Sequence, residues 1–189
     1  MLQAVALLIA MLIAGPAQAH VFGAGGAGFL QGVTHPLFGG DHLLAMVAVG
    51  IWASQLGRPA WWVLPVVFPA AMIGGGLLGW IGAPVPAVEV GIALSVLLLG
   101  CLIGFSIEPG LRISFPLVAM FAIFHGYAHG AELPETASPV SYGLGFILAT
   151  ASLHIFGLAT GRLGQKIWAP AYRAAGIALS AAGIGFLFA

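Results

Sequence analysis

Charged residues are scarce in this sequence of 189 residues. Lys and Arg number five, Asp and Glu number five, and together they make up only 5% of the chain with no net charge. So few charges cannot cover the surface of a water-soluble protein of this length. A net charge of zero also provides no basic surface for nucleic acid. These deficits exclude an ordinary soluble domain and a nucleic-acid-binding protein.

Cysteine is rarer still, since Cys101 is the only one. A single cysteine excludes an internal disulfide and a cysteine-rich metal cluster. What the sequence has in abundance is apolar side chains, at 61% of the residues, and 29 glycines. This composition predicts an integral membrane protein in which helices pack closely and some backbone is irregular around a cavity.

The first 19 residues resemble a signal peptide. An apolar segment from Leu2 to Ala14 is followed by Gly15-Pro16 and then by Ala17-Gln18-Ala19, a small-x-small pattern that signal peptidase cleaves. Cleavage there would make His20 the amino terminus, where the free α-amine and the imidazole can chelate a divalent ion together. The alternative for His20 is a histidine that merely follows the cleavage site. An uncleaved additional helix is the alternative, because no Lys or Arg precedes the apolar segment.

Six apolar segments follow, and each reaches the ~20 residues that a helix needs to cross a bilayer. Short connections rich in Gly and Pro separate them, as expected at helix ends. The sequence therefore predicts an all-α fold, a polytopic membrane helix bundle with one six-helix transmembrane domain over residues 20–189. The predicted spans are Phe29–Ser54, Ala60–Ile81, Ala87–Ser106, Ile113–Glu132, Val140–Thr160 and Trp168–Phe188.

The basic residues predict an orientation, because Lys and Arg are retained on the cytoplasmic side of a membrane. All of them lie in or near the first, third and fifth connections, the fifth being predicted at Gly161–Ile167. The second and fourth connections and both mature termini then face outward, which agrees with an exported amino terminus. We expect a multi-pass protein of the bacterial inner membrane with periplasmic termini. The basic residues are Arg58, Arg112, Arg162, Lys166 and Arg173.

Two histidines and a carboxylate end the fourth predicted span, in the stretch Phe124-His125-Gly126-Tyr127-Ala128-His129-Gly130-Ala131-Glu132. On an α-helix, positions 125, 129 and 132 fall within roughly 60° of one another, so their side chains share one face. Neutral imidazole and carboxylate suit nickel, cobalt or zinc, whereas copper(I) prefers sulfur. We interpret the stretch as half of a metal site. A buried polar network that packs helices is the alternative.

The first predicted span contains a second such group, Thr34-His35-Pro36-Leu37-Phe38-Gly39-Gly40-Asp41-His42. His35 and His42 are seven positions apart and would nearly superpose on one helix face. Asp41 points about 100° away, either as a ligand or as the carboxylate that orients an imidazole. Pro36 and the glycine pair predict a kink or an unwound turn.

These groups are predicted at one depth in the outer half of the bundle, together with Glu89 in the first turn of the third span. An ionisable side chain inside a membrane costs roughly 3 kcal/mol, so several at a common depth indicate a functional site. Simpler alternatives are a helix cap for His35 and a contact with the helix dipole for Glu89. His154, in the cytoplasmic half, is either structural or an exit ligand. Phe68 either packs at a kink or acts as a steric gate.

The patterns His-Pro-x4-Asp-His and Phe-His-Gly-Tyr-Ala-His-Gly-Ala-Glu resemble the two signatures of the HupE/UreJ family of nickel/cobalt permeases. The resemblance covers the whole chain. It implies uptake of Ni²⁺, and leaves Co²⁺ open, in bacteria that mature a nickel hydrogenase or a urease. Glu89 and Phe68 match family positions less specifically. The metal-site residues that the resemblance implies are His35, Asp41, His42, His125, His129 and Glu132.

Other function classes also place histidines in a membrane. A b-type haem protein would use facing histidine pairs but has no need of Asp41 or Glu132. A membrane metal-dependent hydrolase would add a bound water and a general base such as Glu135 or Glu89. A permease needs a site open to one side and ligands few enough to release the ion. We therefore predict a permease rather than an enzyme, with no cofactor. Its partners are the divalent ion and the lipid bilayer, and a homo-oligomer is left open. The candidate ligands are His20, His35, Asp41, His42, Glu89, His125, His129 and Glu132.

Overall fold

The computed structural model of the protein describes residues 28–133 and 138–189, and the regular elements in these ranges are all α-helices. The predicted signal peptide and His20 lie outside the described residues. The helical fold class is confirmed. The helices are α2 (Phe29–Phe38), α3 (Gly40–Leu56), α4 (Ala60–Trp80), α5 (Val88–Gly104), α6 (Leu111–Ala131), α7 (Pro139–Ile167) and α8 (Ala169–Leu187).

Three of the described helices, α4, α6 and α7, are long and apolar enough to cross a membrane. The pair α2 and α3 passes the same test as one span bent by 83°, which raises the number to four. Helix α5 has 17 residues, so it is about 26 Å long against a hydrocarbon core of about 30 Å. The membrane-spanning character of the chain is therefore supported, whereas the full set of six spans stays a prediction.

The break between α2 and α3 falls at Gly39, where the backbone is extended (φ −79°, ψ 108°). The N–H of Gly39 donates to the carbonyl oxygen of His35 at 3.2 Å, and α3 starts at the next residue. The predicted kink in this stretch is confirmed. The expectation that His35 and His42 lie on one face of a continuous helix was wrong, because they belong to two helices of different direction.

The predicted fifth connection at Gly161–Ile167 was also wrong, because α7 is helical through Ile167 and only Trp168 separates it from α8. Gly161 is a helix contact rather than a helix end. A Cβ atom there would overlap the side chain of Ser54 and the backbone of Ile51 on α3. Arg162 therefore lies on the last turns of α7.

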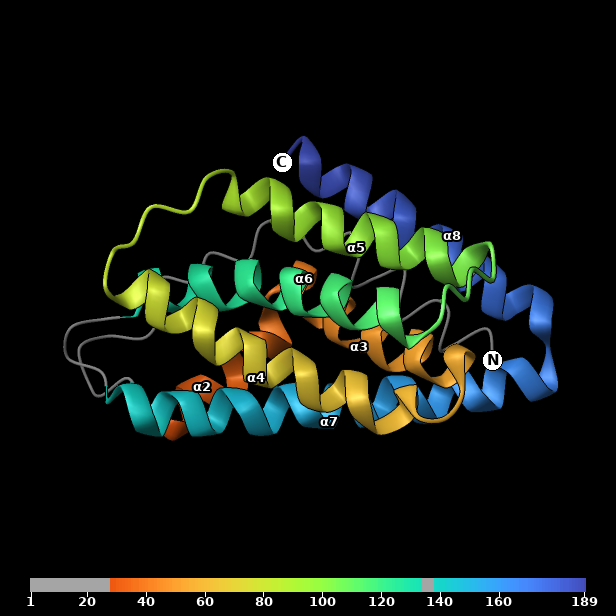
Figure 1. Ribbon diagram of the computed structural model, residues 1–189, viewed down its shortest axis with the longest axis horizontal. Coiled ribbons are helices and arrows are strands. Elements are labelled where there is room, and N and C mark those ends of the chain that lie inside the picture. The colour runs from red at the N-terminus through yellow and green to blue at the C-terminus, as the bar shows by residue number, and fades with distance from the viewer. Residues whose placement is uncertain (1–27, 134–137) are drawn as a thin grey trace.

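The connections alternate between the two ends of the bundle (Figure 1). The segments that follow α3, α5 and α7 lie at one end, which we call the arginine end because all five basic residues of the chain lie in or within two turns of these connections. The segment that follows α4 and the last residues of α6 lie at the opposite end, which we call the histidine end. The ionisable residues that lie near one another at this end include His35, Asp41, His42, Glu89, His129 and Glu132.

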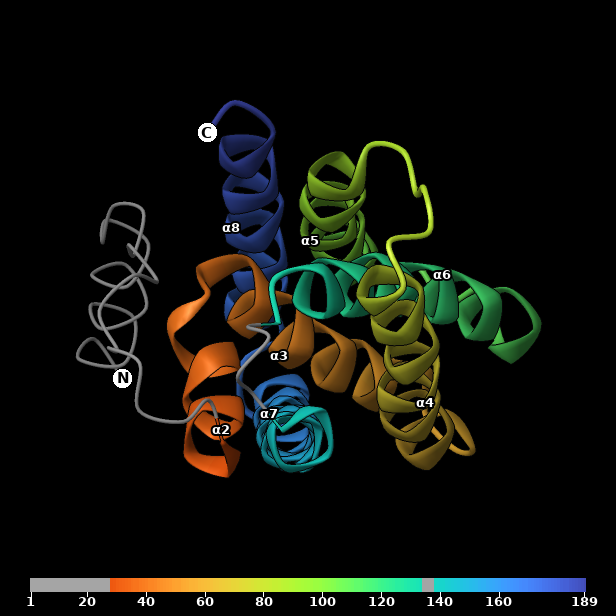
Figure 2. The ribbon, with the colours of Figure 1, turned by 90° about the vertical axis from the view of Figure 1, so that its left-hand side faces the viewer.

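Helix α3 occupies the centre of the bundle, with α4, α5, α6, α7 and α8 packed around it (Figure 2). Ten of its 17 residues are buried. A helix that is apolar on all sides needs such a position. His42 is therefore held in the interior rather than at the lipid surface, and it is 2% exposed.

Helices α4 and α6 touch through glycines on both sides. A Cβ atom on Gly126 would overlap the backbone of Met72, and one on Gly130 would overlap the backbone of Gly76. Small residues that let two backbones meet are the usual basis of helix packing in membranes. Gly126 and Gly130 therefore make the contact with α4, while His125 and His129 beside them face α3.

Candidate metal centre

Three imidazole rings meet between α3 and α6. His125 Nδ1 lies 3.0 Å from His42 Nδ1, and His129 Nε2 lies 3.0 Å from the same atom. His129 Nε2 is also 2.9 Å from His42 Nε2, so it is nearly equidistant from both nitrogens of that ring. His42 and His125 are buried, at 2% and 0% exposure. The two halves of the predicted site are thus brought together.

This arrangement is not a satisfied hydrogen-bond network. A neutral imidazole has one donor and one acceptor nitrogen, and a single N–H of His129 cannot point at two nitrogens of one ring with good geometry. In addition, His129 Nδ1 is buried with no hydrogen-bond partner among the described residues. Lone pairs of several imidazoles that converge on one point can be satisfied by a divalent cation of the borderline class.

Ser95 on α5 fixes which nitrogen of His125 can coordinate. Its hydroxyl donates to the carbonyl oxygen of Ile92 at 2.6 Å and lies 2.8 Å from His125 Nε2. Because the single hydroxyl proton is used by Ile92, His125 Nε2 must donate to Ser95 Oγ. The lone pair of a neutral His125 is then on Nδ1, the atom that faces His42. Ser95 thus orients the His125 ring in the way that outer partners orient metal-binding histidines.

His129 also belongs to a second group, nearer the surface. One ligand atom each of His35, His129 and Glu132 lies within 4.8 Å of the others. The rings of His35 and His129 meet edge to face, with centroids 4.7 Å apart. His35 comes from α2, and Glu132 is the exposed residue that caps the end of α6. The bend at Gly39 lets His35 and His42 approach His129 from different helices.

Two further predicted residues surround this group without entering it. Asp41 Oδ1 accepts a hydrogen bond from the backbone N–H of His42 at 2.7 Å, and its charge also interacts with the His35 imidazole. Glu89 is exposed in the first turn of α5, close enough for its charge to interact with Asp41 and Glu132. These carboxylates give the histidine end a local negative charge, which attracts cations.

The sequence reasoning missed the contribution of α7. The ring of Phe146 packs on His129 and His42, with centroid distances of 4.5 and 5.4 Å. Tyr142 lies one turn earlier, 6.2 Å from His35. The four-residue spacing of Tyr142, Phe146, Thr150 and His154 was the available signal, since such residues share a helix face. All four are buried.

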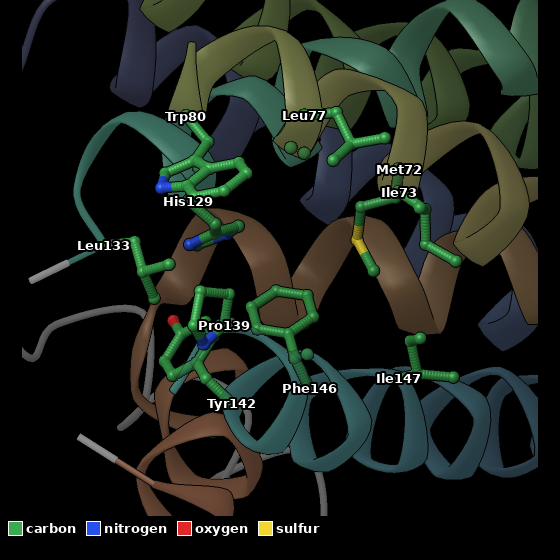
Figure 3. Close-up of a pocket in the computed structure, with 14 residues that line it drawn as sticks. Met72, Ile73, Leu77, Trp80, His129, Leu133, Pro139, Tyr142, Phe146 and Ile147 are labelled. Atoms are coloured by element: carbon green, nitrogen blue, oxygen red, sulfur yellow. The ribbon is translucent and has the colours of Figure 1, made fainter. Parts of the chain in front are cut away.

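A pocket of about 180 Å³ opens beside His129, between α4, α6 and α7 (Figure 3). Apart from His129, the hydroxyl of Tyr142 and the indole N–H of Trp80, its lining is apolar and includes Met72 and Phe146. An apolar wall next to the histidines lowers the local dielectric and strengthens charge interactions at the site.

The bundle and its site define a class: a membrane-embedded helical protein with a candidate centre for a transition metal, built from histidines and carboxylates. The family model described as HupE / UreJ protein matches residues 7–186, and the chain belongs to this family. It is 43% identical over 185 residues to "Protein HupE" of Rhizobium leguminosarum bv. viciae, which covers 95% of this chain and 94% of that protein. No solved structure matches the chain.

Proposed function

We propose that this protein takes up nickel across the bacterial inner membrane, with cobalt as a second substrate of the same route. The ion enters at the histidine end and is coordinated by His42, His125 and His129, with His35 and Glu132 as the first ligands it meets. The observation that carries the proposal is the meeting of three imidazoles within 3.0 Å inside an apolar bundle. Nitrogen ligands in this number suit nickel and cobalt.

Transport requires that the ion can leave the site, and the origin of the ligands supports this. The histidines come from separate helices, α2, α3 and α6, with an irregular segment between the first two. A small shift of α3 against α6 therefore changes the number of ligands, which is how a site can bind and then release an ion. A rigid structural site would gain nothing from such a break.

The proposal includes the orientation of the chain. The histidine end faces the periplasm, both mature termini lie on that side, a signal peptide is removed before His20, and six segments span the membrane. Cysteines introduced at Ser138 and Arg58, in a Cys101→Ser background, are expected to react with an impermeant thiol reagent from opposite sides. Reaction of both from the periplasm would contradict this topology.

Uptake of radioactive nickel by cells that express the protein tests the function. His42→Ala and His129→Ala are expected to abolish uptake, and Asp41→Asn and Glu132→Gln to reduce it severely, with unchanged amounts of protein in the membrane. Ser152→Ala is the matched control, because Ser152 is exposed and its hydroxyl only donates to its own helix at Leu148. Uptake at the wild-type rate in both histidine variants would refute the site.

The geometry favours an ion over a haem group. A haem iron takes two imidazoles from opposite faces of a flat macrocycle, whereas here three imidazoles approach one another directly. A hydrolase would cleave its substrate without accumulating metal. Metal accumulation in whole cells therefore separates the permease from both alternatives.

A further inference from the structure

His154 on α7 is a buried histidine that the proposed site does not use. It is 0% exposed, and neither of its ring nitrogens has a hydrogen-bond partner among the described residues. A buried polar group without a partner destabilises a protein, so a residue that only filled space here would be apolar. The imidazole needs another explanation.

Two oxygen atoms of suitable chemistry accompany this imidazole. Thr150, one turn earlier on the same face of α7, is also 0% exposed, and its hydroxyl oxygen has no partner in the described part of the chain. On α4, the carbonyl of Pro65 has lost its helical partner because Pro69 has no N–H. This carbonyl interacts with the His154 imidazole without forming a well-aligned hydrogen bond.

Phe68 lies between His154 and the proposed site. Its ring is fully buried, with its centroid 5.8 Å from that of His125 and 5.3 Å from that of His154. A single aromatic ring thus separates the innermost histidine of the site from the next histidine along the bundle. His154 is on the side of this ring that leads toward the arginine end, along the face of α7 that begins with Tyr142 and Phe146.

We propose that His154 is a second metal ligand, assisted by the Thr150 hydroxyl and the Pro65 carbonyl, which receives the ion after it passes Phe68. This inference rests on the proposed function and adds the step that follows the outer histidines. One imidazole and two neutral oxygens bind a divalent ion more weakly than several imidazoles and a carboxylate do. A weaker second site suits onward release, because conduction requires that each site also lets the ion leave.

The first test compares transport with binding at the outer histidines. His154→Leu is expected to lower nickel uptake about 10- to 100-fold. This is the loss of affinity or activity that is typical when an outer partner of a metal ligand is removed, and the loss of a weak ligand is expected to be of similar size. The affinity of the purified protein for nickel at the outer histidines should stay at the wild-type value. His129→Ala, in contrast, loses both uptake and affinity.

The second test detects the ligand directly. His154→Cys in a Cys101→Ser background is expected to give a thiolate-to-cobalt charge-transfer band in the near ultraviolet when Co²⁺ is added, and to recover part of the uptake. Ile155→Cys in the same background is the matched control, since Ile155 is the next residue of α7 and is 65% exposed. It should give no such band.

The outcomes separate the two proposals. No nickel uptake by the wild-type protein would refute the proposed function itself. Wild-type uptake in His154→Leu would overturn the second site alone. Loss of uptake in both His154→Leu and His154→Cys without a cobalt band, or an equal band in Ile155→Cys, would show that His154 is structural and would also overturn it.

Discussion

The two ends of the bundle differ in how the polar groups of their side chains are paired. At the arginine end, side chains of α3, α7 and α8 pair donor with acceptor, although the indole N–H of Trp61 there has no partner among the described residues. The side-chain amide of Gln165 donates to Ser54 Oγ at 2.9 Å, and the hydroxyl of Tyr172 donates to Gln55 Oε1 at 3.1 Å. At the histidine end, imidazole nitrogens face one another at 3.0 Å. Because an apolar bundle normally pairs its polar groups internally, we infer that the end where several imidazoles face one another binds the ligand.

The largest expected effect contrasts these two ends directly. His129→Ala removes the side chain that both groups of ligands share, so nickel binding to the purified protein should be lost. Gln165→Ala removes a matched hydrogen bond at the arginine end and should leave nickel affinity unchanged, with a loss of stability of about 1 kcal/mol. Isothermal titration calorimetry measures both. Equal nickel affinity in the two variants would show that the two ends do not differ in nickel binding.

A substitution at a close backbone contact is expected to weaken nickel binding nearly as much as the loss of a ligand does. Gly126→Ala places a methyl group against the backbone of Met72, which forces α6 away from α4 and shifts His125 and His129. We expect a loss of about 1–3 kcal/mol in stability, as for overpacked cores, together with weaker nickel binding. Gly74→Ala is the control, because nothing lies within 4 Å of a Cβ atom there. Thermal unfolding with and without nickel would measure the difference, and equal behaviour of both variants would contradict the close contact.

The sequence predicted which side chains would lie close together better than it predicted their arrangement. The positions of His125 and His129 four residues apart were sufficient to place both rings on one face of α6, because helical geometry dictates it. The bend at Gly39 was expected from Pro36 and the glycine pair, but its angle of 83° is a property of tertiary packing. His35 therefore reaches His129 from α2 rather than from one continuous helix.

The role of glycine was harder to predict from the sequence than that of the histidines. Gly161 was interpreted as the end of a helix, although it allows α3 and α7 to touch, and a one-dimensional pattern does not distinguish these two uses. Ser95 was missed for a related reason. A serine in an apolar helix shows no periodicity, and its role follows only from the neighbours that α6 and its own backbone provide.

A smaller effect is expected from removing the Ser95 hydroxyl, which orients the His125 ring. Ser95→Ala removes the acceptor of the His125 Nε2 proton, so the ring can adopt the tautomer in which Nδ1 carries the proton and cannot coordinate. Nickel affinity should fall about 10-fold and at most 100-fold, the usual cost of removing an outer partner of a metal ligand. Ser95→Thr keeps the hydroxyl and should restore most of the affinity. An unchanged affinity in Ser95→Ala would mean that His125 does not coordinate through Nδ1.

We propose that one ion binds where α3 and α6 bring three imidazoles together. The most direct measurement is diffraction at the nickel absorption edge from crystals of the purified protein soaked in nickel. We expect an anomalous peak bonded to His42, His125 and His129. The absence of a peak at these three histidines, at nickel concentrations that support uptake, would contradict it.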